Sequence, residues 1–385
     1  MTEQKINLRH LQAFVKIYEL GTLLKAARAI HITQPALTQG LARLEDLLEV
    51  RLFDRQHDGM HPSTAARVLY PRARNAQSLI RSRKLTFTHL RAFTALARAG
   101  SYADASAATG LARASLHRSV ADLEGLLNVK LVQRRGRGVE LTPVGSATSR
   151  RFRLALNELS AAADEIRSLD GRAVGRVRIG AMPLSRARVL PTAIVAFRKT
   201  HPDCRLAIAE GSHAELVEPL RDGEFDFLIG ALRTPLPGPD LEQKPLFTDS
   251  PVIVARRDHP LARLKKSPNV LALSRFEWCL PARGVPLREG CEKLFLEAGL
   301  EPPSVKIECG SVLLIRQVLM HSDCLTVLSP DQVAVELKSG WVTVIGAPPD
   351  ALQRTIGLIY REDWRPTATQ EAFVATLEKA CQSGS

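Results

Sequence analysis

Several features that would assign this chain to other classes of protein are missing from its sequence. The N-terminus, MTEQKINLRHLQ, has no basic segment followed by an apolar one, so no secretory signal is predicted. No apolar run approaches the length that crosses a bilayer, and we expect no membrane partner. Cysteine is absent before Cys204, and the six cysteines form no C-x-x-C pair, so we expect reduced thiols in a cytoplasmic protein.

The motifs of common catalytic sites are missing too. The chain has no G-x-S-x-G elbow, no GxxxxGK[ST] loop and no G-x-G-x-x-G after a predicted strand. His57 and His61 have the spacing of one helical turn, but they lie in a turn segment with no thiol nearby. We therefore expect no enzymatic activity, no metal and no cofactor.

Positive charge is unevenly distributed along the 385 residues, whose formal net charge is +13. Residues 1–170 hold 26 Lys and Arg against 15 Asp and Glu, whereas residues 171–385 hold 27 against 25. The front half therefore favours a polyanionic partner, and the back half does not. A membrane surface is also a polyanion, so charge alone does not separate it from nucleic acid.

The front half contains an internal repeat with an offset of 79 residues. Residues 10–55 align without a gap to residues 89–134, and 16 of these 46 positions are identical. Gly21 coincides with Gly100 in this alignment, and Glu45 with Glu124. Shared composition does not produce such regularity, so the chain carries the same structural unit twice.

One copy of the repeat predicts three short helices and a hairpin. In the first copy, apolar residues at helical spacing begin at Leu8, and Gly21 ends that helix. Thr22 is placed to cap a second helix, and Thr33 to cap a third with Pro35 in its first turn. The strand RLFDR and a turn follow. This order describes a winged helix-turn-helix.

The third helix carries polar side chains at positions that the apolar core does not need. Hydroxyls, amides and a guanidinium at its start and outer face are suited to phosphates and base edges. We predict DNA contacts from Thr33, Gln34, Pro35, Thr38, Gln39 and Arg43 of this helix, and from Arg55 of the following strand. The alternative is an ordinary solvated surface, which is also polar.

Residues 8–55 resemble the DNA-binding domain of LysR-type transcriptional regulators. Those proteins begin their recognition helix with Ser/Thr-Gln-Pro-Ala-Leu-Ser/Thr, and residues 33–38 here read TQPALT. The resemblance implies a sequence-specific regulator that binds double-stranded DNA as a homo-oligomer, a dimer or a tetramer. The family usually has one such domain, whereas this chain has two in tandem.

The second copy differs from the first on its polar surface. Ala112 and Ala114 replace the capping threonine and the proline, and the turn of the wing becomes rich in arginine. We predict DNA contacts from Arg113, His117 and Arg118 of the third helix and from Arg134, Arg135 and Arg137 of the wing. Our hypothesis is that the first copy discriminates bases and the second supplies electrostatic hold. Direct reading of guanine by the second copy, or a scaffold role, are the alternatives.

A long helix is predicted after the second copy. Phe152, Leu159 and Ile166 are spaced by sevens, and we interpret 143–172 as a linker helix that pairs with a partner protomer; the alternative is a helix packed on its own domain. Segment 63–84, interrupted by Pro71, lies where a single-domain regulator would place its linker helix. The predicted domains are 6–85 (copy one), 86–142 (copy two), 143–172 (linker helix) and 173–385 (regulatory domain).

The back half alternates between strand and helix. Apolar strands are predicted at 175–182, 204–211 and 225–232, with helices between them, which indicates a parallel sheet with crossover helices. The order resembles the two-lobed α/β regulatory domain of the same family, of type 2 periplasmic-binding-protein architecture. The resemblance implies a first lobe of about 175–252 and 362–385 and a second of about 253–361. The predicted fold class is thus two all-α winged helix-turn-helix copies followed by this domain.

Serines recur at the ends of the predicted strands. Ser185, Ser212, Ser311 and Ser329 each follow a strand and open a helix, where each is at least a helix cap. By the family resemblance, the effector binds at such loops between the lobes. We expect effector contacts from Ser185, Ser212, Pro281, Gly284, Val285, Pro286 and Ser311. Arg186, Arg188 and Arg288 are further candidates to pair with a carboxylate, but an ordinary surface role is the favoured alternative for each of them.

These features together predict a transcription factor whose back half senses a small molecule and changes the DNA contacts. Segments 230–247 and 356–373 resemble regulators linked to sugar binding and to aromatic-acid catabolism, so we expect a sugar or a small organic or aromatic acid. The alternatives are an architectural DNA-binding protein whose back half only oligomerises, and an enzyme tethered to DNA.

Overall fold

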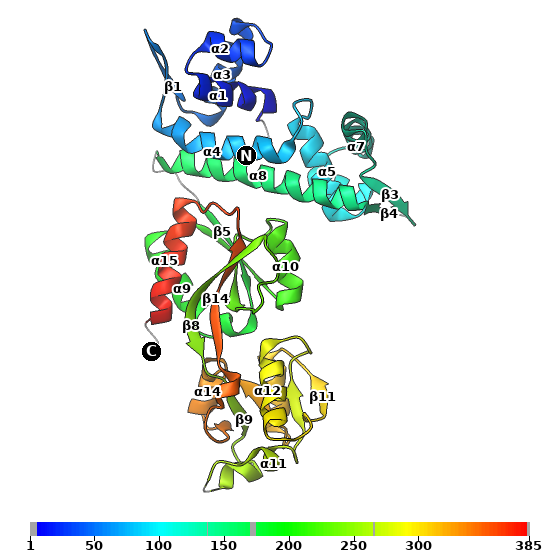
Figure 1. The fold of residues 1–385 in the computed structure, drawn as a ribbon, viewed down its shortest axis with the longest axis vertical. Helices are drawn as coiled ribbons and strands as arrows, with labels where there is room; N and C mark the ends of the chain where they lie inside the picture. The colour runs from blue at the N-terminus through cyan, green and yellow to red at the C-terminus, as the bar shows by residue number, and fades with distance from the viewer. Residues whose placement is uncertain (1–5, 137, 170–174, 265, 383–385) are drawn as a thin grey trace. The chain divides into compact units, whose positions relative to one another are not determined.

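The computed structural model describes residues 6–136, 138–169, 175–264 and 266–382 (Figure 1). The chain divides into two compact units, Met1–Gly175 and Arg176–Ser385. The fold class predicted from the sequence is confirmed: the front unit holds two winged helix-turn-helix copies, and the rear unit is a two-lobed α/β domain. No helix of the described residues is long and apolar enough to cross a bilayer.

The two copies of the front unit repeat the same order of elements. The first comprises α1 (Leu8–Leu20), α2 (Leu23–Ala29), α3 (Gln34–Leu48), β1 (Phe53–Gln56), β2 (Gly59–Pro62) and α4 (Thr64–Ile80). The second comprises α5 (Phe87–Ala99), α6 (Tyr102–Thr109), α7 (Arg113–Leu127), β3 (Val132–Arg135), β4 (Gly138–Leu141) and α8 (Pro143–Leu169). One apolar core extends through both copies, so neither packs as an isolated domain.

A buried or half-buried carboxylate fixes the start of each wing. Glu45 on α3 accepts hydrogen bonds from the backbone N–H groups of Leu52, at 2.7 Å, and Phe53. Glu124, its equivalent on α7, accepts from Leu131 at 2.8 Å and from the following residue. Burial raises the pKa of Glu124, but Lys130 and these N–H groups outweigh burial and lower it overall. The carboxylates therefore satisfy backbone groups, which explains why glutamate occupies both positions.

Each wing also docks on the end of the first helix of its own copy. The carbonyl of Gly21 accepts from the N–H of Met60, and that of Gly100 accepts from Val139, both at 2.8 Å. A Cβ at Gly59 or Gly138 would lie 2.7 or 2.8 Å from the same carbonyl oxygens. Glycine is required at both positions because the backbones approach closely. The two wings are thus held in equivalent positions relative to their third helices.

The helices that follow the two wings, α4 and α8, pack along one another within the chain (Figure 1). Helix α4 continues through Pro71, which interrupts it only in the prediction. The buried face of α8 includes Phe152, Leu159 and Ile166, the residues spaced by sevens. The face that we expected to meet a partner protomer therefore packs inside its own chain. The predicted end of this helix, at 172, lies outside the described residues.

The first lobe of the rear unit is built on a five-stranded sheet in the order β6-β5-β7-β14-β8. Its elements are β5 (Arg176–Ala181), α9 (Val189–Thr200), β6 (Arg205–Glu210), α10 (His213–Arg221), β7 (Phe227–Ala231), β8 (Leu241–Asp249), β14 (Arg354–Arg361) and α15 (Ala368–Gln382). Strands β5, β6 and β7 are parallel, as predicted, whereas β14 runs antiparallel to both β7 and β8. Met182, Glu210 and Ala231, at or next to the carboxyl ends of these parallel strands, line a cleft together with residues of the second lobe.

The second lobe lies between β8 and β14 in the sequence. It comprises β9 (Val252–Arg256), α11 (Val270–Leu273), β10 (Trp278–Leu280), α12 (Pro286–Glu297), β11 (Val305–Glu308), α13 (Val312–Met320), β12 (Thr326–Leu328), α14 (Ala334–Lys338) and β13 (Val342–Val344). The predicted boundary at 361–362 is wrong, because β14 pairs with β7 and so belongs to the first lobe. The prediction of parallel strands holds for β10 and β11 but not for β12 and β13, which flank β9 antiparallel.

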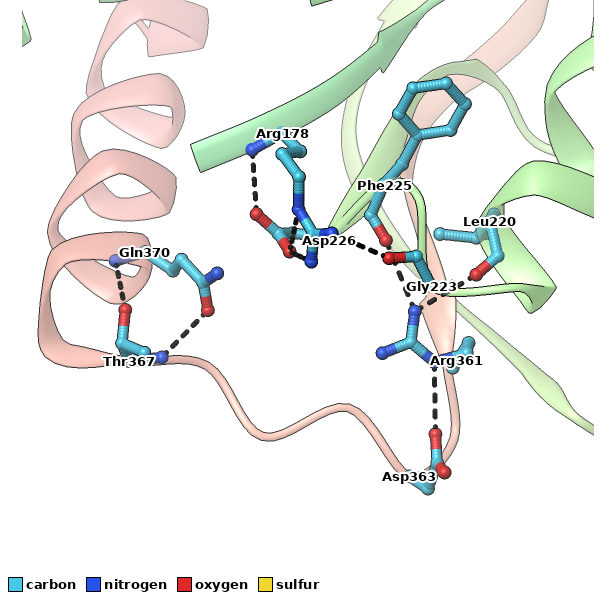
Figure 2. A network of polar contacts seen from close by, with 9 residues as sticks. All are labelled: Arg178, Leu220, Gly223, Phe225, Asp226, Arg361, Asp363, Thr367 and Gln370. Atoms are coloured by element: carbon cyan, nitrogen blue, oxygen red, sulfur yellow. Dashed lines mark hydrogen bonds and ion pairs between the residues drawn. The ribbon is translucent and has the colours of Figure 1, made fainter. Parts of the chain in front are cut away.

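Two arginines hold the first lobe together where β5 begins and β14 ends (Figure 2). Arg178 on β5 binds the carboxylate of Asp226 at 2.8 Å and the carbonyl of Gly223 at 2.8 Å, and Asp226 is only 3% exposed. Arg361 on β14 donates to the carbonyl of Leu220 and, at 3.3 Å, to the carboxylate of Asp363. The turn before β7 is thus tied to both neighbouring strands, which fixes the register in which β7 reaches the interlobe side.

We predict that Asp226→Ala lowers the free energy of unfolding of the rear unit by about 3 kcal/mol, because it leaves the Arg178 guanidinium half-buried without its carboxylate. Asp363→Ala is the matched control: its carboxylate also binds an arginine but is 51% exposed, so a loss below about 0.5 kcal/mol is expected. Urea unfolding followed by tryptophan fluorescence measures both. Equal losses in the two variants would contradict this account of the register.

Candidate DNA interface and effector cleft

The third helix of the first copy presents the residues predicted to contact DNA. Thr33 precedes α3, and its hydroxyl accepts a hydrogen bond from the N–H of Ala36 at 3.4 Å. Pro35 lies in the first turn, where no helical donor is lost. The side chains predicted to contact DNA remain at the surface: Thr33, Gln34, Pro35, Gln39 and Arg43 are exposed, and Thr38 is half-buried. The helix therefore offers hydroxyl, amide and guanidinium groups to a ligand.

The equivalent helix of the second copy, α7, presents a different set of groups. Ala112 provides no side-chain cap. Arg113, His117 and Arg118 are exposed, and the ring of His117 stacks on Tyr102 with 3.5 Å between ring centroids. This stacking holds the imidazole in place at the start of the helix. The sequence interpretation missed Asp122, the exposed equivalent of Arg43, although the alignment of the two copies contains it.

The two wings differ in charge. Arg55 on β1 and Arg134 on β3 are exposed at equivalent positions. Arg135 is exposed too, but it forms an ion pair at 2.8 Å with Glu140 on the neighbouring strand, so part of its charge is neutralised. Arg137, also predicted to contact DNA, lies outside the described residues. Arg134 is thus the described arginine of this wing that is exposed and forms no ion pair.

A cleft of about 920 Å³ lies between the lobes of the rear unit and contains most of the residues predicted to bind an effector. Ser212 of the first lobe and Ser311 of the second line it and cap α10 and α13, and Pro281, Val285 and Pro286 line it from the second lobe. The walls also include apolar side chains of Leu184, Leu287, Leu313 and Ile315. An apolar cleft with a few polar groups is the usual form of a small-molecule site.

Two residues predicted to line this cleft do not do so. Ser185 is fully buried, and its hydroxyl donates to the carbonyl of Met182 inside a short 3-10 helix, so it caps no helix and faces no ligand. Gly284 is absent from the lining, but its carbonyl accepts a hydrogen bond from Arg233 at 3.0 Å. The carbonyl of Gly284, in the second lobe, thus binds the guanidinium of Arg233 in the first lobe.

The three arginines proposed to pair with a carboxylate already have partners in the chain. Arg186 lines the cleft and is bound to Glu210. Arg188 forms an ion pair at 2.8 Å with Asp331 of the second lobe. Arg288 is 3% exposed and is bound to Glu292 and to the carbonyl of Pro281. None of the three is therefore the best candidate for an anionic ligand.

Arg233 and His213 are the cleft residues that the sequence interpretation missed. Arg233 follows β7, and no carboxylate of the described residues forms an ion pair with it; its Nε atom is buried without a hydrogen-bond partner. His213 also lines the cleft, and its Nε2 atom is likewise buried and unpartnered. Burial, and then the charges of Arg233 and Arg221, lower the pKa of His213 to about 4, so this imidazole is neutral at pH 7.

The position of Arg233 beyond a strand end is the signal that would have identified it. We applied that rule to serines, yet Arg233 stands two residues after the last residue of β7, at the same edge of the sheet. His213 was visible only as the residue after a capping serine. Within the described part of the chain, no group of three His, Cys, Asp or Glu side chains is placed to hold a metal ion.

Comparison with known families identifies both units. A profile described as "Bacterial regulatory helix-turn-helix protein, lysR family" matches residues 8–67 and again residues 87–146, an offset of 79 residues. A profile described as "LysR substrate binding domain" matches residues 170–382. The two helix-turn-helix matches coincide with the two copies of the internal repeat.

Individual relatives are transcriptional regulators. HTH-type transcriptional regulator GalR of Pseudomonas putida is 30% identical over 97% of this chain and 97% of its own length. GbpR of Azospirillum brasilense is 29% identical, over 68% of this chain and 77% of its own length. PcaQ of Agrobacterium fabrum is 25% identical over 77% of this chain and 95% of its own length. The P. putida regulator thus matches across both copies of the repeat, whereas PcaQ leaves nearly a quarter of this chain unmatched.

Solved structures share the fold at lower identity. CbnR, a LysR family transcriptional regulator solved in complex with its target DNA, matches with a TM-score of 0.56 and 20% identity, over 77% of this chain and 100% of that chain. Full-length OxyR from Pseudomonas aeruginosa matches with a TM-score of 0.58 and 23% identity, over 77% of this chain and 97% of that chain. These likenesses support the fold of a single helix-turn-helix copy joined to the two-lobed domain.

The difference between the two caps predicts opposite effects of exchanging them. Thr33→Ala should weaken the start of α3 by about 1 kcal/mol, and Ala112→Thr should strengthen the start of α7 by a similar amount, because a hydroxyl there accepts from an otherwise unpaired N–H. Hydrogen exchange of peptides covering α3 and α7 measures each helix separately. Ala114→Thr, inside α7, is the control and should not slow hydrogen exchange of the α7 peptides. Equal slowing of this exchange by Ala112→Thr and Ala114→Thr would contradict the capping explanation.

Proposed function

The chain belongs to the LysR family of bacterial transcriptional regulators, and we propose that both of its winged-helix copies contact DNA while its interlobe cleft binds a small organic acid. The observation that carries the first part is the repetition of the complete reading unit, with an exposed polar third helix in each copy. On this proposal the protein acts where the DNA lies, in the bacterial cytoplasm, and as a binder rather than as an enzyme.

On this proposal the two copies make different contributions to DNA recognition. In the first, the amides of Gln34 and Gln39 and the guanidinium of Arg43 read base edges, with Thr33 and Thr38 on phosphates. In the second, Arg113 and the arginines of the wing bind phosphates, while the guanidinium of Arg118 reads guanine, the alternative to a purely electrostatic role. The positive balance of residues 1–170, 26 basic against 15 acidic side chains, supports this assignment because many phosphate contacts need many cations.

An acid fits the cleft better than the sugar that we also considered. Arg233 retains a positive charge that no carboxylate of the described residues neutralises, and its buried Nε lacks an acceptor. A ligand carboxylate supplies an acceptor and a charge together, whereas a sugar hydroxyl supplies the acceptor alone. The N-termini of α10 and α13, capped by Ser212 and Ser311, add donors on two sides of the cleft. The apolar walls accommodate the carbon skeleton.

The cleft also supports a sensing role over a purely architectural one. Its two walls come from different lobes, and Arg188–Asp331 and Arg233–Gly284 are polar contacts that cross between the lobes. A ligand that binds Arg233 competes for one of these contacts and therefore changes the balance between lobe arrangements. Such a change, passed to the front unit, alters the DNA contacts. Assembly of the chain into a homo-oligomer stays a prediction.

The exposed wing arginine makes a quantitative prediction for DNA affinity. Arg134→Ala should reduce the slope of log affinity against log salt concentration by about 0.9, the value for one lost phosphate contact. Arg135→Ala should reduce it by less, because Glu140 shares its charge, and Glu140→Gln should steepen it. The measurement is titration of a random-sequence duplex by the full chain at several salt concentrations. An unchanged slope for Arg134→Ala would exclude this wing from the DNA.

The effector site is tested by removing one guanidinium at a time. Arg233→Met should weaken the binding of small carboxylates by roughly 10- to 100-fold, the effect of losing a hydrogen bond to a charged group. Arg186→Met is the matched control, because Glu210 already neutralises that arginine. The readout is the rise in melting temperature with benzoate, succinate or glucose. Stabilisation by glucose alone would favour a sugar, and the absence of any shift would favour the architectural alternative.

A further inference from the structure

The helices α4 and α8 are the same element of the internal repeat. Ser63 precedes α4 and Thr142 precedes α8, at positions 79 residues apart. Each hydroxyl accepts a hydrogen bond from an equivalent backbone N–H, that of Ala66 at 3.2 Å and that of Gly145 at 2.9 Å. Two equivalent helices of one chain therefore pack against each other (Figure 1).

Contacts along their length show that α4 and α8 run antiparallel. Midway along α4, Arg72 binds the carboxylate of Glu165 at 2.6 Å. At the end of α4, Arg81 lies close enough to Arg151 that its charge adds to the effect of burial in lowering the pKa of Arg151. Residue numbers thus rise along α4 while those of the neighbouring residues fall along α8.

Two equivalent antiparallel helices are exchanged by a half-turn about an axis perpendicular to the plane that contains them. This half-turn moves Arg72 onto Arg151 and Glu158 onto Leu79. The observed contact of Arg72 with Glu158, at 3.2 Å, thus predicts a contact of Arg151 near Leu79. The neighbour whose charge reaches Arg151 is Arg81, two residues beyond Leu79 and directly after the end of α4, which agrees with this expectation. The two copies are therefore related by an approximate two-fold axis inside one chain.

A half-turn leaves the position of every atom along the rotation axis unchanged and reverses directions perpendicular to it. Helices α3 and α7 therefore lie on the same side of the α4–α8 pair, and they run in opposite directions across it. Figure 1 shows the wing of the first copy at one end of the α4–α8 pair and the wing of the second copy at the other. We infer that a single chain reads an inverted repeat on DNA, with α3 on one half-site and α7 on the other. This inference rests on the proposed function, in which both copies contact DNA.

The two half-sites have different sequences, because the equivalent side chains of α3 and α7 differ. Gln39 in the first copy corresponds to Arg118 in the second, and an amide suits adenine whereas a guanidinium suits guanine. Arg43 corresponds to Asp122, which accepts hydrogen bonds instead of donating them. One chain consequently recognises an inverted repeat of unequal halves, which no symmetric pair of identical copies would select.

The charges between α4 and α8 favour this pairing over the pairing of two identical helices from two chains. Arg72 is 5% exposed, and its partners Glu158 and Glu165 both lie on α8. In the repeat, the positions of those two carboxylates correspond to Leu79 and Thr86. A pair of α4 helices would therefore bury Arg72 against groups that carry no negative charge, which is strongly unfavourable.

Crosslinking of the full chain tests the pairing itself. Arg81, at the end of α4, lies near Arg151 on α8, so the double variant Arg81→Cys with Arg151→Cys should react with a bismaleimide to give a crosslink within one chain. Mass spectrometry of its peptides identifies this crosslink, and the chain still migrates as a monomer on a denaturing gel. The wild-type chain, whose cysteines are all in the rear unit, and the two single variants are the controls. A covalent dimer, or no internal crosslink, would overturn the inference.

Selection of bound duplexes from a random library by the full chain tests the DNA geometry. The expected product is an inverted repeat of unequal halves with one chain bound per repeat. Gln39→Ala should lower the base preference in one half-site about tenfold, and Arg118→Ala should lower it in the other half-site by a similar factor. A direct repeat, or an inverted repeat of equal halves with one chain on each half, would overturn the inference and leave the proposed function intact. Failure of the chain to bind any duplex would instead reject the proposed function.

Discussion

A buried guanidinium unites the two copies of the front unit. Arg72 lies on the helix that ends the first copy, and both of its carboxylate partners, Glu158 and Glu165, lie on the helix that ends the second. Burial lowers the pKa of Arg72, but the two carboxylates more than offset burial and raise it, so the charge is retained. Removing one side of such a pair costs about 3–5 kcal/mol, because the other charge is left buried and unpaired. The position of α3 relative to α7 depends on this contact.

Comparison of the two copies of the repeat distinguishes the residues that stabilise the fold from the residues that are available to bind a ligand. Glu45 and Glu124 bind the same backbone groups in the two copies, and the carbonyls of Gly21 and Gly100 receive the two wings in the same way. These groups satisfy buried donors and acceptors, so a change at any of them would leave a polar atom unpaired. The exposed face of the third helix has no such constraint, and there the two copies have diverged.

The rear unit combines a first lobe that is held by a buried ion pair with a cleft that contains polar atoms without hydrogen-bond partners. The two arginines of Figure 2 secure the first lobe where β5 begins and β14 ends, and Arg178 binds the buried Asp226 there. In the cleft, Arg233 and His213 keep buried nitrogens without partners. Both residues line the cleft together with the serine-capped N-termini of α10 and α13, and no carboxylate of the described residues neutralises Arg233.

The sequence alone determined the features that depend on neighbours along the chain. The repeat, the three helices and wing of each copy, the exposed polar side chains of α3 and α7 and the serine caps of α10 and α13 all follow from local spacing and capping, and the structure agrees with them. The family motif TQPALT and the alternation of strands and helices were sufficient for the fold class and the family.

Tertiary structure alone decided which of these elements meet. The boundary between the lobes was misplaced because β14 joins β7 across more than a hundred residues, and no local pattern records that pairing. Ser185 was assigned to the cleft because it follows a strand, yet a short 3-10 helix turns its hydroxyl inward. The seven-residue spacing in α8 identified an apolar face but not its partner, because a periodic apolar stripe fits any similar stripe. The charges of Arg72, Glu158 and Glu165 select among those partners, and their effect depends on the distances that only the folded chain sets.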